Sequence, residues 1–238
     1  MRIAVVHPKA TCISARKLAK LWGADIFALH KTHQRDFQGY DLVWNYGGSE
    51  NISGENIANK PLGVARCIDK VQTFEVLKRN RIPTVEWAIK KEDVPKTWKS
   101  IVIRDSRTGR KAEGLYFAEQ GEPLRDGELY TEYFPHEYEY RIVVMCGEVV
   151  GRYRKDVEGA DWLFTPMLKQ GFHNVDRMCI AAAEVIGIDY VGFDVLENKY
   201  GKCVIIEGNS GAMLQDEAEE FAKVNLEYIV DYVKIKGV

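Results

Sequence analysis

Short apolar runs recur along the first third of the chain and predict a small α/β unit. Runs at residues 3–6, 25–29 and 41–44 have the length of buried strands, and residues 14–22 carry helix formers up to Gly23. Strands that alternate with helix favour a parallel sheet covered by helices. We therefore expect an N-terminal α/β domain over residues 1–65.

The pattern changes near residue 66, where strand-like runs become more frequent. Asp69 is placed to cap a helix that Asn80 and Pro83 end. Antiparallel pairs joined by short turns are the natural arrangement for the runs that follow. These runs lie at residues 84–89, 101–104, 115–118, 129–134, 140–145 and 149–153, and further helices are expected at 174–186 and 216–233. No internal repeat or long linker interrupts them.

A glycine-containing segment, Asn45-Tyr46-Gly47-Gly48-Ser49-Glu50-Asn51, follows the end of a predicted strand. Open α/β sheets tend to bind ligands at such strand ends. An ordinary surface loop is the simpler account of the segment, and both interpretations stay open.

Residues 192–209 predict a β-hairpin, because two apolar segments flank a turn that contains Asn198 and Gly201. If this turn is symmetric, Asp194 lies opposite Ile205. The register then places the next acidic residue of the second strand diagonally beyond Asp194.

Three polar side chains of this hairpin are expected on one face, because side chains alternate along a strand: Asp194, Glu207 and Asn209. Two carboxylates and an amide offer only oxygen ligands, which suit Mg²⁺ or Mn²⁺. Mg²⁺ bound through one or two carboxylates usually carries the phosphates of a nucleotide as well. The alternative is a hairpin with a solvated polar face.

Charge and cysteine content narrow the class of protein. Lys and Arg number 33 against 35 Asp and Glu, a formal charge of −2, which gives no reason to expect nucleic acid as a partner. Five scattered cysteines without a CxxC pair are typical of a reduced compartment. No apolar run approaches the length of a membrane span. We expect a cytoplasmic protein.

Residues 104–114 form a basic segment between two predicted strands. Its cations are Arg104, Arg107, Arg110 and Lys111. Gly109 and Gly114 have the spacing of a P-loop, but no Lys-Ser or Lys-Thr follows the second glycine, so a Walker-type site is excluded. Mobile cations and backbone amides of such a hairpin can still cover a polyphosphate. The alternative is an exposed charged hairpin.

Taken together, the motifs resemble the ATP-grasp superfamily, in particular its ATP-dependent carboxylate-amine ligases, which include the ribosomal-protein glutamate ligases. The matching segments run in consistent order over residues 66–215. They are Asp69-Lys70, Ile82-Pro83-Thr84, Ile101-Val102-Ile103-Arg104, Tyr130-Thr131-Glu132-Tyr133-Phe134, Glu139-Tyr140-Arg141, Gly147-Glu148-Val149-Val150-Gly151, Gly192-Phe193-Asp194 and Glu207-Gly208-Asn209-Ser210-Gly211. The resemblance implies an α/β protein with two α+β lobes, an ATP-grasp N-terminal lobe over 66–130 and a C-terminal lobe over 131–238. Residues 1–65 would be a Rossmann-like pre-ATP-grasp domain.

The resemblance also implies roles for individual residues. The expected ATP contacts are Arg104, Arg107, Arg110, Lys111, Glu132, Tyr133, Phe134 and Glu139, and the expected ligands of two Mg²⁺ or Mn²⁺ ions are Asp194, Glu207 and Asn209. The expected catalytic cations are Arg141, Arg154 and Lys155, and Arg141, Ser210 and Gly211 are expected to contact substrate. Surface cations on a hairpin are the alternative for Arg141, Arg154 and Lys155.

Three departures from the family pattern concern Arg104, the basic segment and Ser210-Gly211. Arg104 stands where the family usually has Lys, which keeps the charge but changes the donor geometry. The basic segment is poorer in glycine than usual, and Ser210-Gly211 lacks the usual Pro before Gly. These departures affect the identity of the substrate more than ATP binding.

The implied reaction joins a carboxylate to an amine. A carboxylate is a poor electrophile at neutral pH, so ATP would first convert it to an acyl phosphate, and the products would be an amide, ADP and phosphate. The partners would be a carboxylate and an amine, as small molecules or peptides, and a homo-oligomer is compatible with the sequence. The alternatives are a phosphotransferase on the same fold and a nucleotide-sensing module without turnover.

Overall fold

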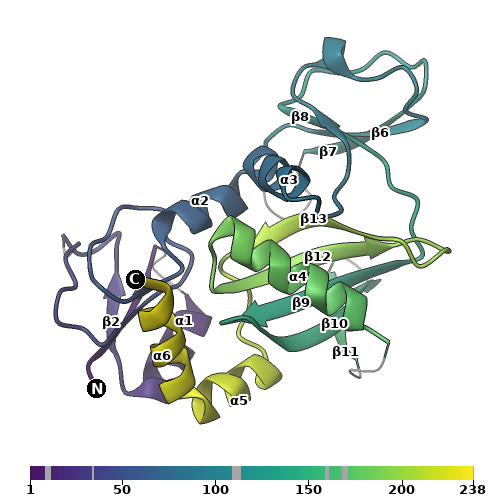
Figure 1. Ribbon diagram of the computed structural model, residues 1–238. Coiled ribbons are helices and arrows are strands. Elements are labelled where there is room, and N and C mark those ends of the chain that lie inside the picture. The colour runs from purple at the N-terminus through teal and green to yellow at the C-terminus, as the bar shows by residue number, and fades with distance from the viewer. Residues whose placement is uncertain (9–11, 34, 109–113, 159–160, 168–170, 238) are drawn as a thin grey trace.

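The computed structural model describes residues 1–8, 12–33, 35–108, 114–158, 161–167 and 171–237. The chain forms an N-terminal parallel sheet, a small antiparallel sheet and a larger antiparallel sheet (Figure 1). In this view the N-terminal unit lies at lower left and the small sheet at upper right. Nowhere in the described ranges does a helix combine the length and the apolar character needed to cross a membrane.

The N-terminal unit is an α/β layer, as the alternation of strands and helix predicts. Its parallel strands are, in spatial order, β2 (Asp25–Ala28), β1 (Ile3–His7), β3 (Leu42–Asn45) and β4 (Ile57–Ala58). Helix α1 (Ile13–Trp22) ends at Gly23, which has the left-handed conformation (φ 59°) that glycine adopts without steric cost. The expected parallel sheet and the expected helix end are both confirmed.

Two consecutive helices connect this unit to the rest of the chain. They are α2 (Pro61–Ile68), which the hydrophobic pattern did not predict, and α3 (Lys70–Arg79). Asp69 caps α3 as expected, because its Oδ1 accepts a hydrogen bond of 3.0 Å from the Val71 backbone N–H. The small sheet follows.

The small sheet is antiparallel, with strands in the order β5 (Trp87–Ala88), β8 (Leu129–Glu132), β6 (Ser100–Arg104) and β7 (Leu115–Glu119). A short 3-10 helix, η1 (Lys91–Asp93), follows β5. The prediction of one strand over 84–89 is wrong, because Thr84 pairs with Ile205 of the larger sheet while β5 pairs with β8. The chain passes from one sheet to the other at that point. Strand β8 spans the expected lobe boundary at residue 130.

The larger sheet is antiparallel and has two different faces. Its strands are, in order, β11 (Asp161–Pro166), β10 (Glu148–Glu158), β9 (Tyr138–Met145), β12 (Tyr190–Glu197) and β13 (Cys203–Asn209). On one face, Ile142 and Val144 pack in a core that includes residues of α4 (His173–Ile186). On the other face, Val143 and Met145 join the core of the N-terminal unit. Strand β11 was not predicted.

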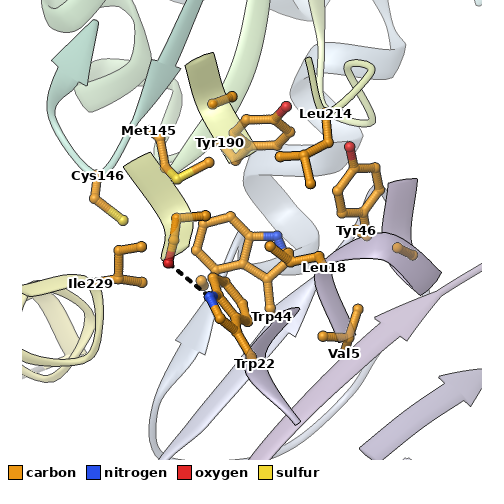
Figure 2. Close-up of a cluster of buried hydrophobic side chains, with 14 of the residues drawn as sticks. Val5, Leu18, Trp22, Trp44, Tyr46, Met145, Cys146, Tyr190, Leu214 and Ile229 are labelled. Atoms are coloured by element: carbon orange, nitrogen blue, oxygen red, sulfur yellow. Dashed lines mark hydrogen bonds between the residues drawn. The ribbon is translucent and has the colours of Figure 1, made fainter. Parts of the chain in front are cut away.

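Figure 2 shows how the N-terminal unit and the larger sheet share that second core. Trp22 and Trp44 of the N-terminal unit lie in one cluster with Met145, Tyr190 and Ile229. The indole N–H of Trp22 donates a hydrogen bond of 2.9 Å to the carbonyl of Ala222 (Figure 2). The expected boundary at residue 65 therefore separates two sheets but not two hydrophobic cores.

The C-terminal segment corrects one prediction. The single helix expected over 216–233 is two helices, α5 (Asp216–Val224) and α6 (Leu226–Gly237). Asn225 lies between them, and its side-chain amide donates a hydrogen bond of 3.0 Å to the carbonyl of Phe221. Asn side chains compete in this way with the backbone hydrogen bonds of a helix. Both helices pack against the N-terminal unit (Figure 1).

Candidate active site

A cavity of about 620 Å³ lies between the small sheet, the larger sheet and the N-terminal unit. Many of the residues singled out in the sequence line it. They are Arg104, Glu132, Tyr133, Phe134, Glu139, Arg141, Lys155, Asp194, Glu207, Asn209, Ser210 and Gly211. Segments that are distant in sequence thus converge on one chamber.

The predicted metal ligands lie at the end of the hairpin formed by β12 and β13. Asp194 is directly opposite Glu207, and Asn209 is opposite Gly192. The expected pairing of Asp194 with Ile205 is wrong, because the register shifts by one residue between Asp194 and Val195. An irregularity of this kind adds a residue to one strand, and here it brings the two carboxylates closer than a regular ladder would.

This donor set fits a hard cation. Asp194, Glu207 and Asn209 line one cavity, and all three offer oxygen. Among the described residues, no cluster of three or more His, Cys, Asp or Glu forms a metal site from protein side chains alone. Mg²⁺ commonly completes its coordination with substrate phosphates and water. The residues present therefore suit a metal that arrives with a nucleotide.

Two cations hold Asp194, whose side chain is only 4% exposed. Arg141, its partner on β9, forms a bidentate pair from Nε to Oδ1 and from Nη2 to Oδ2 (3.0 Å). Lys155 Nζ donates to the same Oδ2 at 3.0 Å and also to Glu139. Burial opposes charge on Arg141, but the carboxylate of Asp194 and their hydrogen bonds raise the pKa of Arg141 above its usual range. Glu139, expected at the nucleotide, contacts Lys155.

Gly192 makes room for Arg141. A Cβ at position 192 would lie 2.8 Å from Cδ of Arg141 and 3.0 Å from Cβ of Ala212. A larger residue would displace the arginine from Asp194. Close packing against Arg141 and Ala212 thus explains why the Gly192-Phe193-Asp194 motif begins with glycine.

Arg104 reaches the cavity from β6 and has an unsatisfied donor. Its Nε is buried and has no hydrogen-bond partner among the residues that the structure describes. Burial lowers the pKa of Arg104, and the charges of Glu207 and Glu139 oppose that shift. An unpaired buried donor costs roughly 1–3 kcal/mol. An anion in the cavity would remove that cost, so Arg104 fits the predicted phosphate contact.

Lys70 is a site residue that the sequence reasoning missed. Its side chain is 5% exposed and lines the cavity, with Nζ 3.4 Å from Oε1 of Glu207. The available signal was the Asp69-Lys70 pair at the start of α3, because the capping aspartate fixes where the next side chain points. Lys70 and Arg104 place positive charge on the side of Glu207.

Two of the remaining predicted cations, Arg154 and Arg107, do not line the cavity. Arg154 pairs with Asp156 at 2.8 Å, since neighbours on a strand face opposite sides and Lys155 takes the inner position. Of the two cations expected in the cleft, Lys155 therefore lines the cavity and Arg154 does not. Arg107 pairs with Asp69 at 3.0 Å. Arg110 and Lys111 lie outside the described residues.

The part of the cavity wall where α3 and the two antiparallel sheets meet is largely apolar. The side chains that form it include Phe74, Val85, Val102, Leu115, Phe117, Leu196 and Ile206. The segment Glu132, Tyr133 and Phe134 joins this wall where the chain leaves β8 for the larger sheet. An apolar wall of this kind is suited to a heteroaromatic base.

The N-terminal unit closes the opposite end of the cavity. Tyr46 and Gly47 line it, and the Tyr46 hydroxyl donates to the carbonyl of Ala212. Gly47 has φ +81°, and a Cβ there would lie 3.4 Å from Cα of Gly211. The strand-end loop is thus part of the cavity wall, in contact with the segment after Asn209. Ser49 and Glu50 of the same loop are exposed, and ligand binding by the loop stays a prediction.

The chain has relatives of known type, although no protein-family model matches it. It is 20% identical over 187 residues to β-citrylglutamate synthase B of Danio rerio. It is 22% identical over 197 residues to N-acetylaspartylglutamate synthase A of Homo sapiens. The alignments cover 66% and 69% of this chain and 45% and 49% of the relatives. The chain therefore spans about half the length of the curated relatives it matches.

Solved structures agree in fold over almost the whole chain. The ATP-grasp ligase PsnB with a minimal precursor, Mg and ADP has a TM-score of 0.71 and 13% identity, with 98% of this chain and 97% of that chain covered. D-alanine–D-alanine ligase from Bacillus anthracis with ATP has a TM-score of 0.66 and 13% identity, with 100% and 97% covered. The chain has the ATP-grasp fold, which confirms the fold class expected from its motifs.

Proposed function

We propose that this protein is an ATP-dependent ligase that joins a carboxylate to an amine through an acyl phosphate, releasing ADP and phosphate. The observation that carries the proposal is the composition of one cavity. Asp194, Glu207 and Asn209 face it from the larger sheet, and the unpaired Nε of Arg104 is buried at its wall. An oxygen donor set and a buried arginine with an unpaired donor, together in an ATP-grasp fold, suit Mg²⁺ and a nucleotide polyphosphate.

The nucleotide would lie between the two sheets. Arg104 and Lys70 would contact its phosphates, and the apolar wall beside Glu132, Tyr133 and Phe134 would hold the base. Arg107 does not line the cavity. Together with Arg110 and Lys111 of the same basic segment, it would approach the phosphates from outside. The ATP and ADP complexes of PsnB and of D-alanine–D-alanine ligase support this choice of cofactor.

Asp194, Glu207 and Asn209 would hold Mg²⁺ or Mn²⁺, and we propose two ions. When bound, such ions neutralise charge on the triphosphate as the terminal phosphoryl group moves. Arg141 and Lys155 would keep positive charge beside that point and orient the acceptor carboxylate. Ser210 and Gly211, next to Tyr46 and Gly47, would border the space for the amine.

The names of the related proteins suggest which substrates to try first. The curated relatives are named for products that contain glutamate joined to citrate or N-acetylaspartate, and PsnB was solved with precursor peptides. A panel of these acids, glutamate and peptides containing Asp or Glu tests the proposal by ADP release. We expect ADP release to depend on both an acid and an amine, and turnover by Asp194→Asn in that assay would contradict the proposal.

Hydroxylamine separates ligation from simple phosphotransfer. An acyl phosphate reacts with hydroxylamine to give a hydroxamate, whereas a stable phosphate ester does not. We expect hydroxamate when the acid, Mg-ATP and hydroxylamine are present and the amine is omitted. ADP formation without hydroxamate would favour a phosphotransferase, and tight ATP binding without ADP formation would favour a nucleotide-sensing module.

A further inference from the structure

Both carboxylate oxygens of Asp194 accept hydrogen bonds from cationic side chains. Arg141 donates to Oδ1 and to Oδ2, and Lys155 donates to Oδ2 as well. The side chains of Arg141 and Lys155 are 16% and 9% exposed. A metal ion that binds Asp194 must therefore compete with cations that already lie there.

Lys155 has a second set of contacts and Arg141 is more firmly held. Lys155 Nζ also donates to Glu139 and lies 4.0 Å from the ring centroid of Trp162 on the edge strand β11. Arg141 is fixed by a planar bidentate pair, whereas a lysine has a flexible stem and a rotatable ammonium group. Arg141 has a cation–π contact with Phe164, at 5.3 Å from the ring centroid, whereas Lys155 is the cation that keeps an ion pair, with Glu139, when it leaves Asp194.

We propose that Lys155 has two positions. In the metal-free protein it neutralises Asp194, and when a divalent cation binds Asp194 it turns toward an anion in the cavity while it stays beside Glu139 and Trp162. The ligand it would then meet is a carboxylate or phosphate group. The inference rests on the proposed function only in taking Asp194 as a metal ligand.

Charge explains why the two events are coupled. A divalent cation at Asp194 repels an ammonium group that shares the same oxygen, and the repulsion is strong because the site is buried. Metal binding therefore makes Lys155 available to an anion. Thermodynamic linkage requires the reverse effect to be equal, so the anion also raises the affinity for metal.

The metal arm of the test uses Mn²⁺ alone and the full chain. Free Mn²⁺ is counted by electron paramagnetic resonance during titration of wild type, Lys155→Gln and Lys155→Arg. Removal of the competing charge makes Lys155→Gln bind Mn²⁺ about tenfold more tightly than wild type, and Lys155→Arg stays close to wild type. Equal or weaker Mn²⁺ binding by Lys155→Gln overturns the inference.

The anion arm needs no metal. Asp194→Asn leaves Lys155 and Arg141 without their carboxylate, so it binds inorganic phosphate about tenfold more tightly than wild type in calorimetry with EDTA. The double variant Asp194→Asn with Lys155→Gln loses that gain. Asp176→Asn is the matched control, because Asp176 pairs with Arg152 and neither lines the cavity. A folded Asp194→Asn with wild-type phosphate affinity overturns the inference.

These outcomes separate the inference from the proposed function. Wild type that binds Mn²⁺, with no gain in either variant, rejects the two positions of Lys155 and leaves the ligase intact. Wild type that binds no Mn²⁺, even with a non-hydrolysable ATP analogue, removes the metal assignment and the inference with it. Circular dichroism confirms that each variant is folded before it is titrated.

Discussion

Two arginines on neighbouring strands form the same kind of ion pair, but the two pairs lie in different surroundings. Arg141 on β9 holds Asp194 with two hydrogen bonds, and Arg152 on β10 holds Asp176 of α4 at 2.9 and 2.5 Å. Both pairs are largely buried. The first faces the cavity, and the second fastens a helix to the opposite face of the sheet.

The surroundings of the two pairs differ more than their geometry. Asp194 has an additional cation in Lys155, lies opposite Glu207 and lines a chamber. Neither Asp176 nor Arg152 lines that chamber. A bidentate pair is therefore not evidence of a functional site, whereas opposed carboxylates and surplus cations around one cavity are. Substitutions at each pair test this distinction.

The largest expected effect is at Asp194. Asp194→Asn removes a proposed metal ligand and should lower turnover about a thousandfold or more. It also leaves Arg141 and Lys155 without their carboxylate, so we expect the free energy of unfolding to fall by about 3 kcal/mol. Steady-state ADP release with Mg²⁺ and urea denaturation measure the two effects. Glu207→Gln should lose similar activity, and near-normal activity in either variant would contradict the metal site.

The next effect is on nucleotide affinity. Arg104→Met removes a proposed phosphate contact, and we expect the Kd for a non-hydrolysable ATP analogue to rise roughly ten- to a hundredfold. Stability should stay level or increase, because the unpaired buried Nε is removed as well. Calorimetry of Arg104→Met beside Arg107→Met gives the comparison, since Arg107 does not line the cavity. Equal losses in both variants would show that the wall position of Arg104 has no special role.

The pair of Arg152 and Asp176 should affect stability and leave turnover almost unchanged. Asp176→Asn leaves Arg152 unpaired and should lower the free energy of unfolding by about 2–4 kcal/mol, with kcat within twofold of wild type. The double variant Arg152→Met with Asp176→Leu should recover most of that stability, because apolar residues can replace a buried pair. Urea denaturation and ADP release are run side by side. A large loss of kcat in a stable Asp176→Asn would remove the distinction between the pairs.

The smallest effect is expected at Gly192. Gly192→Ala places a Cβ against Arg141 and Ala212, so the arginine must shift away from Asp194. We expect a loss of about 1–2 kcal/mol in stability and a several-fold fall in turnover. Thermal unfolding and kinetics measure both. If neither changes, Arg141 has more room beside Gly192 than the packing indicates.

Local chemistry was sufficient for much of the molecule. The strand runs, the end of α1 at Gly23 and the cap of α3 at Asp69 depend on residues close in sequence, and all three were predicted. The sequence also predicted the shared face of Asp194, Glu207 and Asn209, but in the fold Glu207 reaches that face through the register shift, because the regular ladder that starts at the turn would place Ile206 opposite Asp194. One failure, the helix break at Asn225, has a local cause as well.

Contacts between distant segments were decided only when the chain folded. The irregularity beside Asp194 sets which residue faces Glu207, and it depends on packing across two strands. The position of Lys70 beside Glu207 and the contact of Gly47 with Gly211 join elements far apart in sequence. Alternation and spacing tell which face a side chain takes along its own strand. Alternation and spacing do not predict which charged side chain of another element will contact a given residue. For that reason only the tertiary structure identified the cations around Asp194.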